Sequence, residues 1–539
     1  MPPMTLPPNQ PVRSFAPSSP ERASLTAEIA RQRANPRRAL PVINGKAVDT
    51  GTSTDMREPH AHANSLGTYA SAGAPEAEAA ITAALDARHD WSRMEPAARR
   101  AVFLRAAELL AGPFNDRLLA ATMLAQSKTA FQSEIDASCE LIDFLRFNVA
   151  FAELIDAMQP LSSPAERNRL EHRPLDGFVF AAAPFNFTAI AGNLALAPAL
   201  MGNTVVWKPS ERAVYSAAFL MDLFEAAGLP PGVINMLPAE TPAAIGDTVL
   251  ASPHLAGVHF TGSTAAFDRI WQTVGSNISR YRSYPRLVGE TGGKDFVFAH
   301  ASADVDALVT ALVRGAFDYQ GQKCSAASRA YIPFSLWKPV TERLADIVSS
   351  LKMGDVSDLT NFMGAVIDQR AYTQISAFLD HAASAPGHRK IAGAAPSDKE
   401  GWFIPPTVIA CDDPKSHIMT EEIFGPVLGL YAYPDGKLAE TLALVDQSTP
   451  YALTGAIFAQ DQAIINQLSL ALRDAAGNFY INDKPTGAVV GRQPFGGGRR
   501  SGTNDKAGSP FNLLRWSSPR TVKETFVPPV SHLYPHMAG

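Results

Sequence analysis

Apolar positions recur with two different patterns along the chain. In residues 74–151 they return every three or four positions, which predicts three helices, the third at about 129–153. A shorter helix is predicted before them, at 24–32. From residue 178 onward, short apolar runs alternate with helical patterns. Such alternation is typical of parallel sheets covered by helices on both faces, so we expect an α/β protein.

The alternating part of the chain predicts two sheets. Strands of the first are expected at 178–183, 204–208, 233–237, 258–260 and 287–289, with helices between them. Strands of the second are expected at 296–298, 330–332, 408–411, 428–433, 455–459 and 479–482. Ligands of parallel sheets bind outside the carboxyl ends of the strands, so we looked for chemistry there.

Two segments do not fit either sheet. Pro160 and Pro164 end the helical part, and residues 159–172 are expected to protrude. The tail 512–526 alternates well enough for strands, with apolar Leu514, Trp516 and Val522. Together they could form an exposed flap, and an exposed strand edge invites pairing with another subunit.

Length and charge narrow the class of protein. A chain of 539 residues exceeds what one hydrophobic core supports, so at least two domains are expected. Lys plus Arg number 47 against 52 Asp plus Glu, a net charge of −5, and no nucleic-acid partner is expected. No apolar run is long enough to span a bilayer, and the first 20 residues lack the apolar core of a secretory signal. The expected location is cytoplasmic.

Cysteine is sparse, which argues against a disulfide framework. Cys139 and Cys411 are expected to be structural. No Cys-x-x-Cys or His-x-x-x-His spacing suggests a metal site, so no metal is expected. His60 and His62 are close in sequence, but their polar loop predicts that they are solvated.

Cys324 differs from the other cysteines because small residues surround it. Its neighbours Gly321, Ser325 and Ala326 leave room for a reactant to approach the sulfur. The thiol is therefore either a nucleophile or a small buried hydrophobe. The adjacent Lys323 either favours the thiolate or points to solvent.

Polar side chains follow the first two strands of the first sheet. Asn186, after 178–183, offers a side-chain N–H, although asparagine is also a common turn residue. Lys208 and Glu211, after 204–208, suit the hydroxyls of a nucleotide ribose. The carboxylate would repel a 2′-phosphate, which favours NAD over NADP. The alternative is a solvated loop with a helix cap at Ser210.

Two further motifs follow later strands of the same sheet. At Gly262-Ser263 a strand ends and a helix begins, so free N–H groups could face a pyrophosphate. This is not the Gly-x-Gly-x-x-Gly fingerprint, and alone it is only a turn and a cap. Glu290, after 287–289, could be the general base for a water, or a surface partner of Lys294.

Taken together, these motifs resemble the aldehyde dehydrogenase superfamily over nearly the whole chain from about residue 20. The motifs occur in the superfamily's order: Pro184-Phe185-Asn186-Phe187, Lys208-Pro209-Ser210-Glu211, Phe260-Thr261-Gly262-Ser263, Glu290-Thr291-Gly292-Gly293-Lys294, Gly321-Gln322-Lys323-Cys324 and Glu422-Ile423-Phe424-Gly425-Pro426. Within it, segments 475–484 and 493–497 resemble the branch of L-glutamate 5-semialdehyde dehydrogenases. Phe267, where most superfamily members have a second glycine, also fits this branch.

The resemblance implies an aldehyde dehydrogenase fold with three parts. A Rossmann-like parallel-sheet NAD domain would comprise 1–158 and 173–289, with part of 484–507. An α/β catalytic domain would comprise 290–483. A β-flap for oligomerisation would comprise 159–172 and 508–539, in a homodimer or a higher homo-oligomer. The chain resembles the stand-alone form of the enzyme, functionally coupled to a separate proline dehydrogenase in proline catabolism.

The resemblance also implies a mechanism with NAD as cofactor. Cys324 would attack the aldehyde and form a thiohemiacetal, with Asn186 and the Cys324 N–H holding the oxyanion. After hydride transfer, Glu290 would activate the water that hydrolyses the thioester. NAD would be held by residues in or directly after three of the motifs: Lys208, Ser210, Glu211, Gly262, Ser263, Thr264, Ala265, Ala266, Glu422 and Phe424.

The substrate residues implied by the resemblance surround the thiol and a glycine-rich loop at 487–498. They are Phe187, Ser325, Gly487, Ala488 and Phe495. Many relatives have serine where this chain has Ala488, so one hydroxyl donor to the substrate carboxylate is lost.

Three alternatives to this activity stay open in the sequence. One is a dehydrogenase of another carboxylated semialdehyde, such as succinate semialdehyde. The second is a non-catalytic protein that keeps the fold, against which Cys324, Glu290 and Asn186 together argue. The third is a thioesterase-like hydrolase, which would need no nucleotide.

Overall fold

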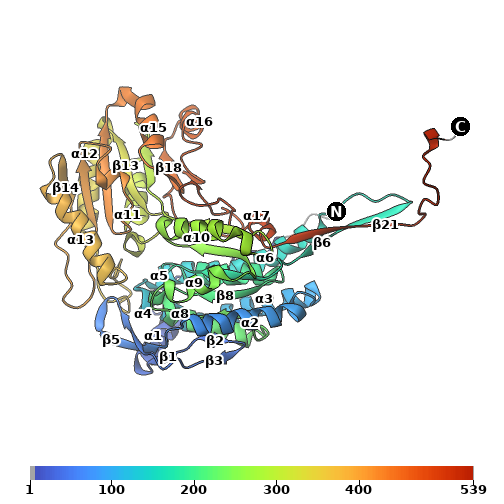
Figure 1. Ribbon diagram of the computed structural model, residues 1–539. Helices are drawn as coiled ribbons and strands as arrows, with labels where there is room; N and C mark the ends of the chain where they lie inside the picture. The colour runs from blue at the N-terminus through green and yellow to red at the C-terminus, as the bar shows by residue number, and fades with distance from the viewer. Residues whose placement is uncertain (1–5, 538–539) are drawn as a thin grey trace.

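Two seven-stranded sheets form the centre of the protein, whose computed structural model describes residues 6–537 (Figure 1). The first sheet has the order β11-β10-β7-β8-β9-β2-β3. Its strands are β2 (Val42–Ile43), β3 (Lys46–Ala47), β7 (Phe178–Ala182), β8 (Thr204–Lys208), β9 (Ile234–Met236), β10 (Leu255–Thr261) and β11 (Arg286–Glu290). β7 to β11 pair in parallel, so the predicted α/β class is confirmed.

The register of this sheet brings the sequence motifs to one edge. Ala182 lies opposite Lys208 on one side of β7 and opposite Phe260 on the other. Thr261 lies opposite Glu290. Four neighbouring strands therefore end at the same level, and the loops that follow them meet there.

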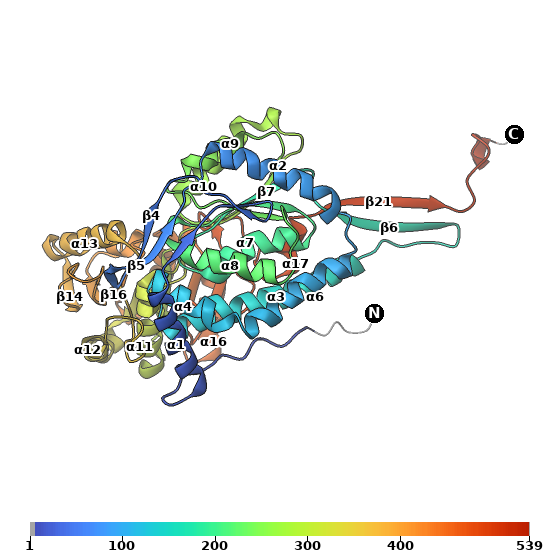
Figure 2. The ribbon, with the colours of Figure 1, turned by 90° about the horizontal axis from the view of Figure 1, so that it is seen from below.

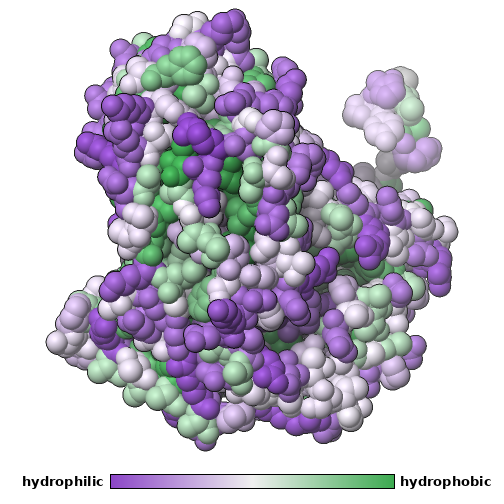
Figure 3. Space-filling model, turned by 90° about the vertical axis from the view of Figure 1, so that its left-hand side faces the viewer, coloured by the Kyte–Doolittle hydropathy of each residue, from purple (hydrophilic) through white to green (hydrophobic). Residues whose placement is uncertain are grey.

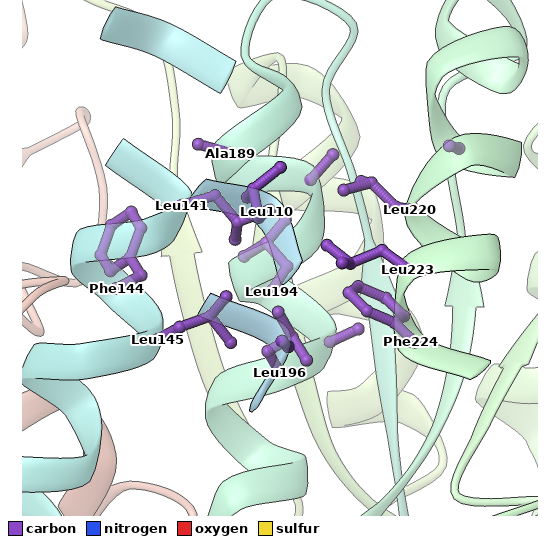
Figure 4. Packing of buried hydrophobic residues seen from close by; sticks show 14 of the residues in the cluster. Leu110, Leu141, Phe144, Leu145, Ala189, Leu194, Leu196, Leu220, Leu223 and Phe224 are labelled. Carbon is purple, nitrogen blue, oxygen red and sulfur yellow. The ribbon is translucent and has the colours of Figure 1, made fainter. Parts of the chain in front are cut away.

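Helices cover both faces of the first sheet because alternate strand residues are buried on opposite sides. Phe178, Phe180 and Val206 face α2 (Ala74–Trp91), α9 (Ala243–Ala251) and α10 (Thr264–Ser276). Val179 and Val205 face the other layer, which Figure 4 shows packed through Leu110, Leu141, Leu194 and Leu220. That layer comprises α3 (Pro96–Ala111), α4 (Asn115–Gln126), α6 (Glu140–Ala157), α7 (Thr188–Leu200) and α8 (Val214–Ala226).

The second sheet has the order β14-β15-β16-β13-β12-β18-β19. Its strands are β12 (Asp295–Ala299), β13 (Ala327–Pro333), β14 (His388–Ala392), β15 (Thr407–Cys411), β16 (Val427–Tyr433), β18 (Thr454–Phe458) and β19 (Asn478–Ile481). All pair in parallel except the edge strand β14, which sequence reasoning missed. One face of this second sheet is covered by α11 (Val305–Phe317) and α12 (Phe334–Ser350). The other face is covered by α13 (Gln369–Ser384), α15 (Leu438–Gln447) and α16 (Gln462–Ala471).

The N-terminal part differs from the prediction in three places. The helix predicted at 24–32 is α1 (Pro20–Ala34); it starts earlier because Ser19 caps its N-terminus, and it also continues two residues further. The third predicted helix is α5 (Ala130–Ser133), a π-helical turn η1 (Glu134–Cys139) and α6. A small sheet, β1 (Arg37–Ala39), β5 (Ala61–Tyr69) and β4 (Thr54–Glu58), was not predicted. Within residues 6–537, no helix is both long and apolar enough to cross a membrane.

The flap segments do pair with each other. β6 (Glu166–Arg173) and β21 (Ser518–Thr525) form an antiparallel ribbon that extends away from the body (Figure 2). Figure 3 shows that the end of the C-terminal segment also stands clear of the body. The strand expected around Leu514 is wrong, because that residue ends the helix α17 (Pro510–Leu514). Residues 1–5 and 538–539 of the predicted ranges lie outside the described chain.

Candidate active site

A cavity of about 740 Å³ collects residues from both sheets. It is lined by the two predicted chemical groups Cys324 and Glu290, and by all five predicted substrate residues, Phe187, Ser325, Gly487, Ala488 and Phe495. Thr486 and residues 9–12 also line it, and sequence reasoning missed both. Asn186 is buried behind this lining, 4 % exposed.

The nucleophile follows a turn that the sequence does not reveal. Tyr319, Gln320 and Gly321 are left-handed, with φ of 50°, 56° and 66°. A side chain at Gly321 would collide with the Gly425 carbonyl oxygen, 2.2 Å from an ideal Cβ. The Gln320 amide fixes the turn by donating to the Ser127 and Ala365 carbonyls, at 3.0 and 2.6 Å. Such strain persists only where surrounding contacts hold it, and here it presents Cys324 to the cavity.

The Cys324 thiol is surrounded by acids as well as by apolar atoms. Burial raises its pKa well above the usual value, and the carboxyl groups of Asp295, Glu422 and Glu290 raise it further. The N–H of Ser325 acts in the opposite direction. The thiol form therefore dominates at neutral pH until a base or a cationic ligand approaches.

Lys323 does not point to solvent. Its side chain is buried, and Nζ donates to the side-chain Oε1 of Gln132 at 2.5 Å and lies 3.3 Å from the Asp136 carboxylate. Lys128 Nζ donates to the same carboxylate at 2.6 Å. The two lysines thus share one buried acid, Asp136, which lines the cavity as Lys323 does, and the solvated alternative for Lys323 is wrong.

The Asn186 side chain is directed at the nucleophile turn. Its Nδ2 donates to the Gln322 carbonyl oxygen at 3.0 Å. That bond occupies one of the two amide hydrogens and fixes the orientation of the group. The second hydrogen is then available to an oxygen that develops charge beside the thiol.

Glu290 ends β11 and is held from the glycine-rich loop. The Gly497 N–H donates to its Oε2 at 3.3 Å. Burial raises the pKa of Glu290 well above the usual value, although that N–H and Lys506 oppose the shift. A carboxylate with a raised pKa is suited to take a proton from water. The alternative partner, Lys294, is buried, 2 % exposed, so a surface ion pair of these two residues is wrong.

The ends of β8 and β10 present groups that fit a nucleotide. Lys208 Nζ lies 3.7 Å from the Glu211 carboxylate and donates to the Pro209 carbonyl at 3.2 Å. Ser210 does cap the following helical turn, so the cap and the ribose interpretations are compatible. Ser263 caps α10, and Thr264, Ala265 and Ala266 form its first turn, where helices leave N–H groups free for an anion.

Glu422 reaches the strand end between the two sheets. Its Oε1 accepts the Gly293 N–H at 2.9 Å, and burial raises its pKa to about 7. A side chain at Gly292 would collide with this carboxylate, because an ideal Cβ would lie 2.3 Å from its Oε2. Phe424, left-handed with φ of 55°, packs edge-on against Phe185 with centroids 5.9 Å apart.

His60 is buried, not solvated as predicted. It lies with Glu58 and Asp355, at 3.1 and 3.3 Å from its Nε2. These three groups could ligate a metal ion, but the Arg33 guanidinium takes the cation's place, 2.7 Å from Glu58 and 2.9 Å from Asp355. The cluster joins α1 and β4 to the loop before α13, and it is an ion-pair network.

Comparison with known proteins agrees with this geometry. Residues 46–522 match the sequence profile of the aldehyde dehydrogenase family. The mitochondrial delta-1-pyrroline-5-carboxylate dehydrogenase of Mus musculus is 48 % identical over 531 residues, covering 98 % of this chain and 94 % of that protein.

Solved structures also match nearly the whole chain. The delta-pyrroline-5-carboxylate dehydrogenase of Mycobacterium tuberculosis, bound with NAD, is 54 % identical with a TM-score of 0.96, covering 99 % of both chains. Proline utilization A of Bdellovibrio bacteriovorus is 30 % identical with a TM-score of 0.91, covering 97 % of this chain and 53 % of that one. Because the family profile matches residues 46–522 and these relatives match nearly the whole chain, the chain belongs to the aldehyde dehydrogenase family.

Proposed function

We propose that this chain oxidises L-glutamate 5-semialdehyde, formed from delta-1-pyrroline-5-carboxylate, to L-glutamate with NAD as hydride acceptor. The observation that carries the proposal is the cavity, which holds a thiol, a base and a glycine-rich loop together. Relatives that match nearly the full chain at 46–54 % identity carry the name of this enzyme.

The first half of the reaction belongs to Cys324 and Asn186. The thiol gives its proton to water, and the thiolate adds to the aldehyde carbon, so that a C–S bond forms and the C=O π electrons move to oxygen. The Asn186 amide hydrogen left over from the Gln322 bond, with the Cys324 N–H, stabilises this oxyanion. The oxygen then regains its double bond as hydride leaves the carbon, and Cys324 carries a thioester.

NAD, when bound, supplies the acceptor for that hydride. Lys208 and Glu211 would hold the adenine-side ribose, and the first turn of α10 the pyrophosphate. Glu422 and Phe424 would lie by the nicotinamide ribose and ring. These groups fit a dinucleotide because they include a carboxylate for hydroxyls and free backbone N–H groups for phosphate.

Glu290 completes the cycle. Its carboxylate takes a proton from water, and the oxygen adds to the thioester carbon. The C–S bond then breaks, which releases glutamate and returns the thiolate of Cys324. The raised pKa of Glu290 makes it a stronger base than an exposed glutamate, which is what this step needs.

The amino-acid end of the substrate would lie at the loop that begins at Gly487. Ser325 Oγ lies 2.7 Å from Thr486 Oγ1, so its hydroxyl is already oriented toward this loop. Gly487 is left-handed with φ of 89°, which lets its backbone face the cavity. The N–H groups of Gly487 and Ala488 with the Ser325 hydroxyl would bind the carboxylate.

Assembly and location remain predictions. The exposed ribbon of β6 and β21 supports pairing with a second copy of the chain. The chain aligns with about half of proline utilization A, which supports functional coupling to a separate proline dehydrogenase. Several relatives are named as mitochondrial, so the cytoplasmic expectation gains no support from them.

NAD-dependent turnover of L-glutamate 5-semialdehyde tests the proposal directly. NADH formation should be greater with this substrate than with succinate semialdehyde or propanal, and greater with NAD than with NADP. Cys324→Ala should abolish it, while NAD binding measured by calorimetry persists. Preferred turnover of succinate semialdehyde, or NADH formation by the Cys324→Ala variant, would overturn the proposal.

A further inference from the structure

The N-terminal arm, residues 6–19, forms one wall of the substrate cavity. Its residues 9–12 line the cavity beside the loop that begins at Gly487. The arm has no regular secondary structure before α1, but it is firmly attached. Arg13 pairs with Asp116 at 2.9 Å and Glu134 at 3.0 Å, and Phe15 beside it is buried.

Asn9 connects this arm to two other walls of the cavity. Its Nδ2 donates to the Asp143 carboxylate of α6 and to the Val490 carbonyl, both at 2.8 Å. Its Oδ1 accepts from Arg492 Nε at 2.9 Å. The neighbouring Gln10 N–H donates to the same Asp143 at 2.7 Å. The side-chain amide of Asn9 thus uses three of its four hydrogen-bonding positions, two of them for residues more than 480 positions away in the sequence.

We propose that Asn9 is a positioning residue, which fixes residues 487–493, the first part of the glycine-rich loop, against α6. The inference rests on the proposed function, because that function places the substrate carboxylate on Gly487 and Ala488. The loop's backbone N–H groups bind a carboxylate well only if they are held in place before the substrate arrives. Asn9 supplies that restraint through Val490 and Arg492 and does not touch the reacting atoms.

The contacts distinguish donor from acceptor roles. Asn9→Asp keeps the size of the side chain and the oxygen facing Arg492, but loses both N–H bonds and places a second carboxylate beside Asp143. Asn9→Ala loses all three bonds without adding charge. Ser14→Ala, on the same arm with an exposed side chain, is the matched control.

The kinetic test compares an aldehyde with a carboxylate and one without. For L-glutamate 5-semialdehyde we expect KM to rise about fivefold in Asn9→Ala, because the loop loses its restraint. In Asn9→Asp we expect a rise of about tenfold, because the added carboxylate also repels Asp143. For propanal, kcat/KM should stay within about twofold, as should the KM for NAD, because neither ligand uses the loop. Ser14→Ala should match the parent chain throughout.

Hydrogen exchange measures the restraint without activity. Peptides covering 487–493 should exchange faster in both Asn9 variants and not in Ser14→Ala. Equal losses with both aldehydes, or unchanged exchange together with unchanged KM, would overturn the inference. If the parent chain prefers another carboxylated semialdehyde, the proposed function fails, while the exchange result still decides the role of Asn9.

Discussion

Replacing Gly289 with alanine should damage the protein through a single collision. An ideal Cβ at Gly289 would lie 2.3, 2.4 and 2.6 Å from three ring atoms of Phe267. The backbone of Gly289 is ordinary β conformation, so the cost is steric and not conformational. The ring cannot move aside easily, because it stacks on Phe260 at 5.4 Å and meets Trp271 at 5.6 Å.

The size of the effect follows from overpacking. Extra methyl groups in a full core cost about 1–3 kcal/mol. With an unfolding entropy of about 2.1 cal/mol/K per residue over 539 residues, we expect Gly289→Ala to lower the thermal midpoint by roughly 1–3 °C. Because Glu290 is the next residue, thioester hydrolysis should slow as well. Phe267→Ala alone should cost about 3–5 kcal/mol, since it removes a buried ring.

The double variant tests the mechanism. With Phe267→Ala in place, the methyl group at 289 enters the space of the missing ring, so the double variant should be about 1–3 kcal/mol more stable than the sum of the single effects. Thermal unfolding followed by circular dichroism measures all three variants under one protocol. Additive effects would refute the argument, because they would mean that the methyl group never contacted the ring.

Three further changes have directions set by the structure. Glu290→Gln should give a burst of about one NADH per active site and then slow turnover. In the parent chain, hydrolysis of the thioester should accelerate as pH rises through neutrality, because burial raises the pKa of Glu290. A hydrolysis rate that does not depend on pH would contradict this. Ala488→Ser should lower the KM for L-glutamate 5-semialdehyde about fivefold, one hydrogen bond of about 1 kcal/mol, and an unchanged KM would exclude a hydroxyl contact. Arg33→Met removes the arginine partner of buried Glu58 and leaves only His60 beside it, which should cost up to about 3–5 kcal/mol in unfolding experiments. The pKa of Glu58 is lowered: burial raises it, but His60 and Arg33 outweigh burial. The ionised Glu58 therefore stabilises the folded protein above the pKa of the unfolded state, and this stabilisation is lost as pH falls. The deficit of Arg33→Met should therefore shrink toward pH 4, and a constant deficit would argue against the ion pair.

The strands of the two sheets could be predicted from the sequence because they are buried on both faces. Such strands are short continuous apolar runs, and 204–208 is β8 without any shift of its ends. The small sheet of β4 and β5 has no such signal, since most of its residues are exposed or half-buried and polar. The edge strand β14 was missed for the same reason.

Site residues could be predicted only where a reactive side chain lies next to a sequence pattern of its own segment. Cys324 and Glu290 each follow a recognisable element and carry small or glycine neighbours. The left-handed turn at Tyr319 and Gln320 has no such signal, because neither residue favours positive φ. Asn9 was missed for another reason: its partners lie 134 and 481 residues away, and no local pattern reports a contact at that separation.

Phe267 shows how a departure from a family pattern becomes interpretable through structure. From the sequence, it is a large ring where the superfamily commonly has glycine, at a helix start that must accept a pyrophosphate. In the fold, the ring turns away from that helix end and lies against Gly289 of the neighbouring strand. The backbone of α10 is therefore left open to the ligand, while the ring fills the space that a side chain at 289 would occupy. The bulky ring at 267 and the missing side chain at 289 thus fill the same space between them. Substitution at either position should therefore be tolerated only when the other changes with it.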